Sequence, residues 1–167
     1  MKSPQVTHHF DSPVVLEFTE SVIESWYPGE RPILFVPCAK SKPIQNSKSH
    51  KQLFHRFQDC CEMLIISEPM TVIPYSFFDY PPYEYPPSAL WRIKGEAEKF
   101  KRRLARFIQR KRLNERCCRF LLPQHHLLIL WASWERAFGN VENLDGYGYT
   151  YATRWFFAEK LIQELCD

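Results

Sequence analysis

The chain is 167 residues long, with a hydrophobic fraction of 45% and a charged fraction of 25%, the proportions of an ordinary globular domain. This length is enough to bury a substantial core, and we expect a single domain over residues 1–167. No apolar run approaches the roughly 20 residues that a membrane span needs. Residues 1–10 also lack the apolar stretch of a secretory signal. We therefore expect a cytoplasmic protein that does not bind a membrane.

The six cysteines form no C-x-x-C pair and no spacing with histidine that is typical of a structural zinc site. Neighbouring cysteines, as at 60–61 and 117–118, rarely bridge each other. We expect no metal site and no cofactor. Five of the cysteines are expected to be reduced thiols of the core, and Cys38 is the exception.

The net charge is only +3, but the basic residues are unevenly distributed. Half of all lysines and arginines lie between Lys94 and Arg119, where only three glutamates oppose them. A basic helix face of this size can bind polyanions, and the candidates for contact with a nucleic-acid backbone are Arg102, Arg103, Arg106 and Arg110. The alternative is an ordinary solvated helix face.

The first half of the chain predicts two helices and two buried strands. Ser12-Pro13 is typical of a helix start, and apolar residues recur at helical spacing over about residues 13–26. A short, wholly apolar run over 33–36 predicts a strand that is covered on both faces, as in a parallel sheet. After a loop, we expect a helix over about 47–61 and a second buried strand over 63–66.

The segment from Glu68 to Ala89 contains six prolines, a density that excludes a regular helix or a central strand. Aromatic side chains fill the gaps between the prolines, which favours a packed, functional loop. The basic helix follows over about 94–113, and a third strand is expected over 118–122.

Residues 124–138 fit a helix, although the periodicity leaves a strand open for the first half of this segment. A glycine-aromatic loop over 146–149 then precedes a last helix over about 151–165. Strands that alternate with helices predict an α/β fold, a three-layer sandwich around a mostly parallel central sheet.

The densest chemistry of the chain follows the first predicted strand, where an open α/β sheet binds its ligands. Cys38 is a candidate nucleophile, because neighbouring lysines and a helix N-terminus would favour its thiolate. The hydroxyls of Ser47 and Ser49 suit an anionic or carbonyl group, and His50 titrates near neutrality. Each of these residues has an ordinary structural alternative, such as a core thiol or an N-cap serine. Their crowding at one strand end favours a functional site.

The spacing of this stretch resembles a known signature. Pro37-Cys38, Lys42-Pro43, Ser47 and His50 follow the pattern P-C-x3-K-P-Y-x2-S-x2-H of the archaeosine synthase core domain, with Ile44 in place of the tyrosine. Five residue types at the same spacing make a strong local match.

Two further segments carry the same resemblance. Residues 67–74 are similar to the family's T-S-P-L-G-x-V-P, with Thr71 in place of the glycine, and residues 80–86 are similar to its Y-P-A-A-H-Y-D. In the second segment, Glu84 and Pro86 replace the histidine and the aspartate, which alters the pocket if those groups orient the substrate. The resemblance extends from about residue 14 to about residue 104.

The resemblance implies a fold similar to uracil-DNA glycosylases and transfer of the amine of lysine onto the nitrile of 7-cyano-7-deazaguanine in tRNA. The chain shows no G-Q-D-P-Y-type water-activating loop, so base excision is disfavoured. The family enzyme also carries transglycosylase-like and RNA-binding domains, which we do not expect within residues 1–167. A stand-alone relative would use those of a partner or act on a smaller substrate.

From these observations we predict catalytic roles for Cys38, His50 and Lys42. Seven further residues are expected to bind the substrate: Pro37, Ser47, Ser49, Pro69, Tyr80, Glu84 and Tyr85. The expected function is amine transfer to a nitrile or amide carbon of a 7-deazaguanine-type base, in tRNA or another nucleic acid. Two alternatives are a non-catalytic nucleobase- or nucleic-acid-binding module and a partner subunit of a transglycosylase-type modification enzyme.

Overall fold

The computed structural model describes residues 6–7, 9–39, 44–77, 83–86 and 89–166 of the chain. The strands are β1 (Val6–Thr7), β2 (Ile33–Pro37), β3 (Glu62–Ser67), β4 (Thr71–Pro74), β5 (Tyr83–Glu84), β6 (Cys118–Pro123) and β7 (Leu144–Tyr149). The α-helices are α1 (Pro13–Ser25), α2 (Lys48–Phe57), α3 (Ala89–Arg92), α4 (Glu96–Arg110), α5 (Gln124–Phe138) and α6 (Arg154–Cys166). Short 3-10 turns precede α2 (η1, Ile44–Asn46), β6 (η2, Leu113–Glu115) and α6 (η3, Tyr151–Thr153).

Five strands form one sheet in the order β4-β3-β2-β6-β7. The β3–β4 pair is antiparallel and the other neighbouring pairs are parallel. The register places Pro37 of β2 opposite Ile66 of β3, and Phe35 of β2 opposite Phe120 of β6. The carboxyl ends of β3, β2 and β6 therefore lie side by side at the same end of the sheet. β1 and β5 pair in parallel as a separate, short ribbon.

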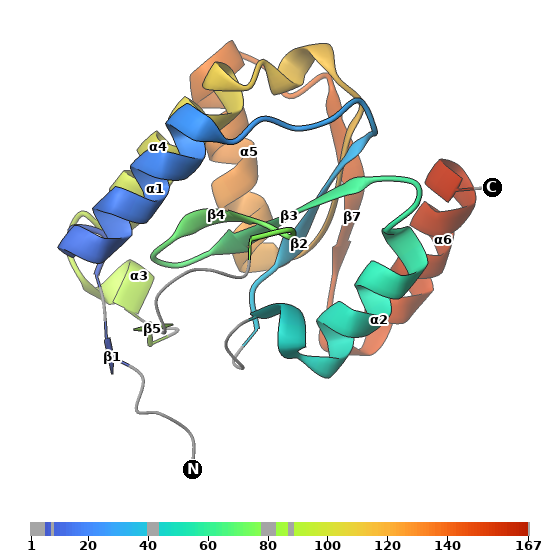
Figure 1. Ribbon diagram of the computed structural model, residues 1–167, viewed down its shortest axis with the longest axis horizontal. Coiled ribbons are helices and arrows are strands. Elements are labelled where there is room, and N and C mark those ends of the chain that lie inside the picture. The colour runs from blue at the N-terminus through green and yellow to red at the C-terminus, as the bar shows by residue number, and fades with distance from the viewer. Residues whose placement is uncertain (1–5, 8, 40–43, 78–82, 87–88, 167) are drawn as a thin grey trace.

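Helices cover both faces of this sheet. α1, α4 and α5 lie on one side and α2 and α6 on the other (Figure 1). Every residue of β2 is buried, as the apolar run predicted for a strand with helices on both faces. The predicted three-layer α/β sandwich with a mostly parallel sheet is confirmed. Within the described part of the chain, no helix is long and apolar enough to cross a membrane.

Two edge strands were not expected from the sequence. The proline-rich segment contains β4, which is an edge strand, so its prolines are compatible with the pairing. The glycine-aromatic segment predicted as a loop is the last part of β7. A Cβ atom on Gly146 would come within 2.2 Å of the Phe120 carbonyl oxygen, so the glycine allows β7 to approach β6 closely.

The structure also defines the boundaries of two helices more closely than the sequence did. Residues 124–138, which periodicity left open, form the single helix α5, and Gly139 ends it with a positive φ of 79°. The basic helix α4 is shorter than predicted, since Gly95 precedes its start and residues 113–115 form a separate 3-10 turn.

The expectation of five reduced core cysteines is wrong in part. Cys60, just after α2, forms a disulfide with Cys166 at the end of α6, because the two helices pack side by side and bring these residues together. Cys61 and Cys118 are free and buried, as expected, whereas Cys117 is free and exposed.

Candidate functional site

Three chemically active side chains converge where three neighbouring parallel strands end. Cys38 directly follows β2, Glu68 directly follows β3, and His126 lies in the first turn of α5 just after β6. Because β3, β2 and β6 are adjacent in the sheet, their carboxyl ends bring these residues together from distant parts of the sequence. We call this group the Cys38–Glu68–His126 cluster.

The distances within the cluster are short. His126 Nε2 lies 3.0 Å from Glu68 Oε1 and 3.1 Å from Glu68 Oε2. The Cys38 sulfur lies 3.7 Å from Glu68 Oε2 and 4.0 Å from His126 Nε2. His126 is 1% exposed, the Glu68 side chain is 12% exposed, and Cys38 is half-buried. The thiol, the carboxylate and the imidazole thus share one partly enclosed space, with Nε2 pointing at both partners.

The charges of the cluster are strongly coupled. Burial alone would lower the pKa of His126, but the nearby Glu68 carboxylate and the Cys38 sulfur outweigh it and raise this pKa to about 10. Burial would likewise raise the pKa of Glu68, and the charge and hydrogen bond of His126 reverse the effect, so that this pKa is lowered. At neutral pH the cluster therefore holds an imidazolium that donates a hydrogen bond to a carboxylate.

Two tyrosines interact electrostatically with members of the cluster. Tyr149, the last residue of β7, has its pKa raised to about 12, chiefly by burial, with a smaller contribution from the nearby Cys38 and an opposing one from Arg154. Burial, followed by the carboxylates of Glu96 and Glu68, raises the pKa of Tyr85. Both phenols therefore stay protonated at neutral pH and can act as hydrogen-bond donors near the cluster.

The residues predicted from the sequence lie in several different surroundings. Pro37 is buried at the end of β2, next to Cys38, and Pro69 is buried after Glu68, to which it is joined by a cis peptide bond. The Ser47 hydroxyl accepts a hydrogen bond from the His50 amide, so Ser47 is the N-cap of α2. Ser49 lies in the first turn of α2 and is half-buried.

His50 packs against Tyr75. Its ring is buried and stacks against Tyr75, and its carbonyl oxygen accepts a hydrogen bond from the Tyr75 hydroxyl. The structure places His126 Nε2 4.0 Å from the Cys38 sulfur. The catalytic role expected for His50 stays a prediction.

The four remaining predicted residues give less information. Lys42 and Tyr80 lie outside the described residues. Glu84 lies in the short strand β5, and Tyr85 follows it and packs edge-on against Phe10 at a centroid distance of 5.7 Å.

The four arginines proposed for nucleic-acid contact mostly bind acidic residues of the same chain. Arg103 is buried and pairs with Asp11 at 2.8 Å. Arg106 pairs with Glu20 and Glu24 of α1, and Arg110 pairs with Glu24. Only Arg102 is exposed without an ion pair to another described residue. Much of the basic face of α4 is therefore used to hold α1, which the local charge count could not reveal.

Sequence reasoning missed two members of the cluster. Glu68 entered only as part of a family-like segment, and the His125-His126 pair was not considered as a site. The sequence did contain a signal for His126. A histidine in the first helical turn after a buried parallel strand lies at the carboxyl end of the sheet, where Cys38 also lies.

A groove of about 680 Å³ lies away from the cluster. It is lined by side chains of α2, of the start of β3 and of neighbouring segments, among them Arg31, Lys51, Phe54 and Tyr75. None of its lining residues belongs to the cluster. The candidate site is therefore defined by the contacts among Cys38, Glu68 and His126 and not by this groove.

Comparison with known proteins gives a family for this architecture. Residues 15–129 match the model of a family described as a domain of unknown function, DUF5591. The chain belongs to the DUF5591 family. The match includes β2, β3, β6 and the start of α5, so all three members of the cluster lie within the DUF5591 region.

A solved structure has the same fold. The protein in "Crystal structure of AF0587, a protein of unknown function" is 22% identical to this chain, with a TM-score of 0.63. The alignment covers 90% of this chain and 50% of the AF0587 chain, so this chain spans about half the length of that relative. No curated protein matches the chain.

Proposed function

We propose that this DUF5591 protein is a relative of the archaeosine synthase core domain that modifies a nitrile or amide carbon of a 7-deazaguanine-type base. The observation that carries the proposal is the position of the Cys38 thiol beside the His126–Glu68 ion pair, at the carboxyl ends of three parallel strands. A thiol next to an imidazolium is the arrangement that supports a cysteine nucleophile.

The reaction follows from the three side chains. Cys38 gives its thiol proton to the Glu68 carboxylate, to which it donates a hydrogen bond at 3.7 Å, and the proton returns to the sulfur when the thiolate leaves at the end of the reaction. The thiolate adds to the nitrile carbon while His126 Nε2–H gives its proton to the nitrile nitrogen, which forms a thioimidate and neutral imidazole. An amine then attacks the same carbon, the carbon–sulfur bond breaks, and the thiolate leaves. His126 takes the proton that the amine releases, so the product is an amidine and the imidazolium is restored.

Each residue has a distinct role in this scheme. Glu68 holds the His126 ring in place and keeps it protonated until the proton is needed. This assignment gives His126 the proton-transfer role that the sequence suggested for His50. Tyr149 and Tyr85, whose phenols stay protonated, are candidates for binding the polar edges of a base.

The backbone at Thr71 supports the resemblance on which the substrate class rests. Thr71 stands where the family pattern has glycine, and its φ is 73°, a left-handed conformation that favours glycine. The glycine of the family pattern thus falls where this backbone needs one. Glu68 stands at the position of the family's serine, which gives this chain a carboxylate partner for His126.

Fewer arginines are available to contact a nucleic acid than the charge pattern suggests. Arg103, Arg106 and Arg110 are already paired with carboxylates, and Arg102 remains as the exposed candidate for a phosphate contact. We propose that the base is presented in tRNA or another nucleic acid, with a transglycosylase-type partner protein supplying the remaining contacts.

Covalent trapping tests the proposal. The protein is incubated with 7-cyano-7-deazaguanine, as the free base and within tRNA, without an amine acceptor, and the adduct is mapped by peptide mass spectrometry. We expect one added base on Cys38, none in Cys38→Ser, and formation slower by about 100-fold or more in His126→Gln. The matched control Cys117→Ser, which removes an exposed thiol outside the cluster, should react like the wild type.

Two outcomes would contradict the proposal: no adduct with either form of the base, or an adduct on Cys117 that persists in Cys38→Ser. A preference for the tRNA form that weakens steeply with salt would support the nucleic-acid arm, because phosphate contacts release counterions.

A further inference from the structure

The cluster contains three different kinds of metal ligand. Cys38 offers a sulfur, Glu68 a carboxylate oxygen and His126 the ring nitrogen Nε2, and these atoms all lie within 4.8 Å of one another. The three residues follow separate strands that are neighbours in the sheet, and they are packed within the fold. The sheet therefore fixes the distances between them.

The separations fit the coordination shell of a small cation. With bonds of about 2.3 Å to sulfur and about 2.0–2.1 Å to nitrogen and oxygen, a tetrahedral Zn²⁺ holds its ligand atoms about 3.3–3.6 Å apart. In the cluster the corresponding distances are 3.7 Å for sulfur to oxygen, 4.0 Å for sulfur to nitrogen and 3.0 Å for nitrogen to oxygen. Shifts of about half an ångström or less would bring all three atoms onto one cation.

The charges and the ligand types indicate the class of cation. A divalent ion that binds here displaces the protons of the His126 imidazolium and the Cys38 thiol. The resulting thiolate and the carboxylate together neutralise the ion, and the neutral imidazole adds the nitrogen that zinc-class metals favour. Mg²⁺ and Ca²⁺ take oxygen ligands, so a site with one sulfur and one nitrogen selects against them. Three protein ligands leave one position of a tetrahedral shell open for water or a substrate atom.

We propose that Cys38, Glu68 and His126 form a binding site for a thiophilic divalent cation of the Zn²⁺ class. Such an ion binds the sulfur lone pair that the covalent reaction needs. Its occupancy therefore blocks the nucleophile reversibly, a consequence that rests on the proposed function, whereas the binding itself does not.

Cobalt substitution tests the site directly. Full-length protein is freed of metal with a chelator, titrated with Co²⁺ without oxygen, and monitored for the ultraviolet thiolate-to-cobalt charge-transfer band. We expect one equivalent of Co²⁺ to produce the band, Zn²⁺ to displace it, and Mg²⁺ to leave it unchanged.

Matched variants assign the ligands. Cys38→Ser should abolish the band, and Glu68→Gln and His126→Gln should weaken affinity by more than the roughly 10- to 100-fold that loss of an outer-shell partner costs. Cys117→Ser and His125→Gln, which change an exposed thiol and the neighbouring exposed histidine, should bind like the wild type. A band that persists in Cys38→Ser, or that disappears in Cys117→Ser, would overturn the site.

A measurement on the unaltered protein covers the case of a variant that fails to fold. One equivalent of Zn²⁺ should protect Cys38, but not Cys117, from alkylation, and a chelator should restore the reaction. Absence of protection would contradict the metal site while leaving the trapping experiment with 7-cyano-7-deazaguanine unaffected. Protection without any adduct in that experiment would support the metal site and contradict the proposed function.

Discussion

At the scale of single residues, the proton on His126 determines the state of its neighbours. It forms a charged hydrogen bond with Glu68 and lies 4.0 Å from the Cys38 sulfur, in a place from which solvent is almost excluded. A buried charge of this kind is costly unless it is paired. The pairing raises the pKa of His126 and lowers that of Glu68, so the two shifts have one common cause.

The raised pKa of His126 predicts a pH-dependent stability. The folded value of about 10 exceeds the ordinary 6.5, so the contribution is fully present below about pH 6.5 and is lost as the pH rises through about 10. Urea unfolding from about pH 6 to about pH 10 should show the wild type losing stability relative to His126→Gln. Parallel pH profiles for the two proteins would show that His126 is not charged in the folded state.

A second prediction at this scale concerns the backbone at Thr71, whose φ of 73° is unfavourable for a residue with a Cβ atom. Thr71→Gly should be more stable than Thr71→Ala by about 1 kcal/mol, because both lose the buried hydroxyl and only glycine adopts this conformation without strain. The free energies of unfolding of the two variants give the answer. Equal stabilities, or a more stable alanine variant, would contradict the strained conformation.

Single residues of the site were predictable to a limited extent. The position of Cys38 at a strand end followed from one apolar run and the loop after it. Its partner His126 lies 88 residues further along the chain, and only the strand order brings the two together. The His50 ring stacks against Tyr75, a contact that the sequence did not predict.

At the scale of elements, the buried strands and long helices could be read from the sequence, and the edge strands could not. β2, β3 and β6 have continuous apolar runs because helices cover both of their faces. β4 and β7 lie at the edges, where proline and glycine are tolerated and the apolar pattern is weaker. These residues had indicated loops.

The close approach of β6 and β7 predicts a severe effect of one methyl group. Gly146→Ala would place a Cβ atom 2.2 Å from the Phe120 carbonyl oxygen and 2.5 Å from its nitrogen, so the strands must separate. We expect a loss of stability on the order of 4 kcal/mol, measured by urea unfolding.

The matched control is Gly148→Ala, whose Cβ atom would meet the end of the Leu127 side chain at 3.0 Å and the Leu122 carbonyl oxygen at an ordinary contact distance of 3.9 Å. It should cost far less, because a side chain can move and a strand backbone cannot. Similar losses in the two variants would contradict the assigned register of β6 and β7.

At the scale of the whole molecule, the Cys60–Cys166 disulfide joins α2 to the end of the chain across a sequence separation of 106 residues. In the chain-entropy account, closing a loop of this length stabilises a protein by about 4–5 kcal/mol. The double variant Cys60→Ser with Cys166→Ser should lose stability of that order in urea unfolding, while Cys117→Ser should unfold like the wild type. Unchanged stability, or free thiols at both positions in the native protein, would contradict the bridge.

Disulfides are typical of oxidising compartments and of intracellular proteins from hyperthermophiles.

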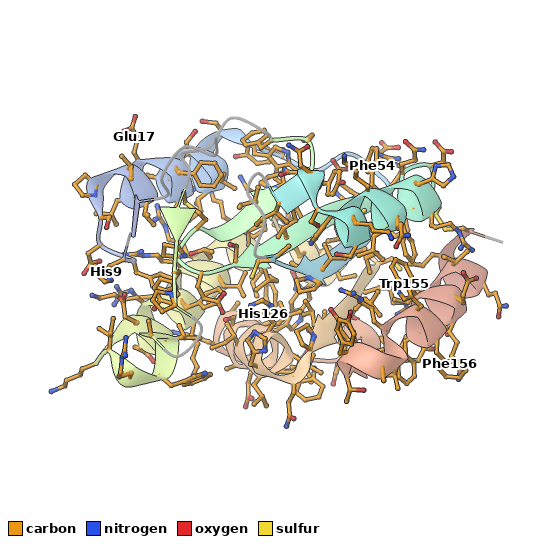
Figure 2. The ribbon with its side chains drawn as sticks, turned by 90° about the horizontal axis from the view of Figure 1, so that it is seen from below. His9, Glu17, Phe54, His126, Trp155 and Phe156 are labelled. Atoms are coloured by element: carbon orange, nitrogen blue, oxygen red, sulfur yellow. A yellow bond between two sulfur atoms is a disulfide. The ribbon has the colours of Figure 1, made fainter. Side chains whose placement is uncertain are left out.

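The bridge joins two helices on the face of the sheet opposite α4 and α5 (Figure 1). His126 lies on α5, whereas Trp155 and Phe156 extend from α6 (Figure 2). The disulfide and the cluster thus depend on different parts of the fold, and their effects can be measured separately.

The reactivity of Cys38 is the measurement that tests the central claim most directly. The native protein, with a chelator present, is alkylated competitively at neutral pH, and the labelling rates of Cys38, Cys61, Cys117 and Cys118 are compared by mass spectrometry. Burial raises the pKa of Cys61 and of Cys118 to about 12, so both should react slowly. Cys38 should react fastest, ahead of the exposed Cys117, and its rate alone should fall in His126→Gln. Faster labelling of Cys117, or a Cys38 rate that does not change in His126→Gln, would contradict the cluster as the reactive centre.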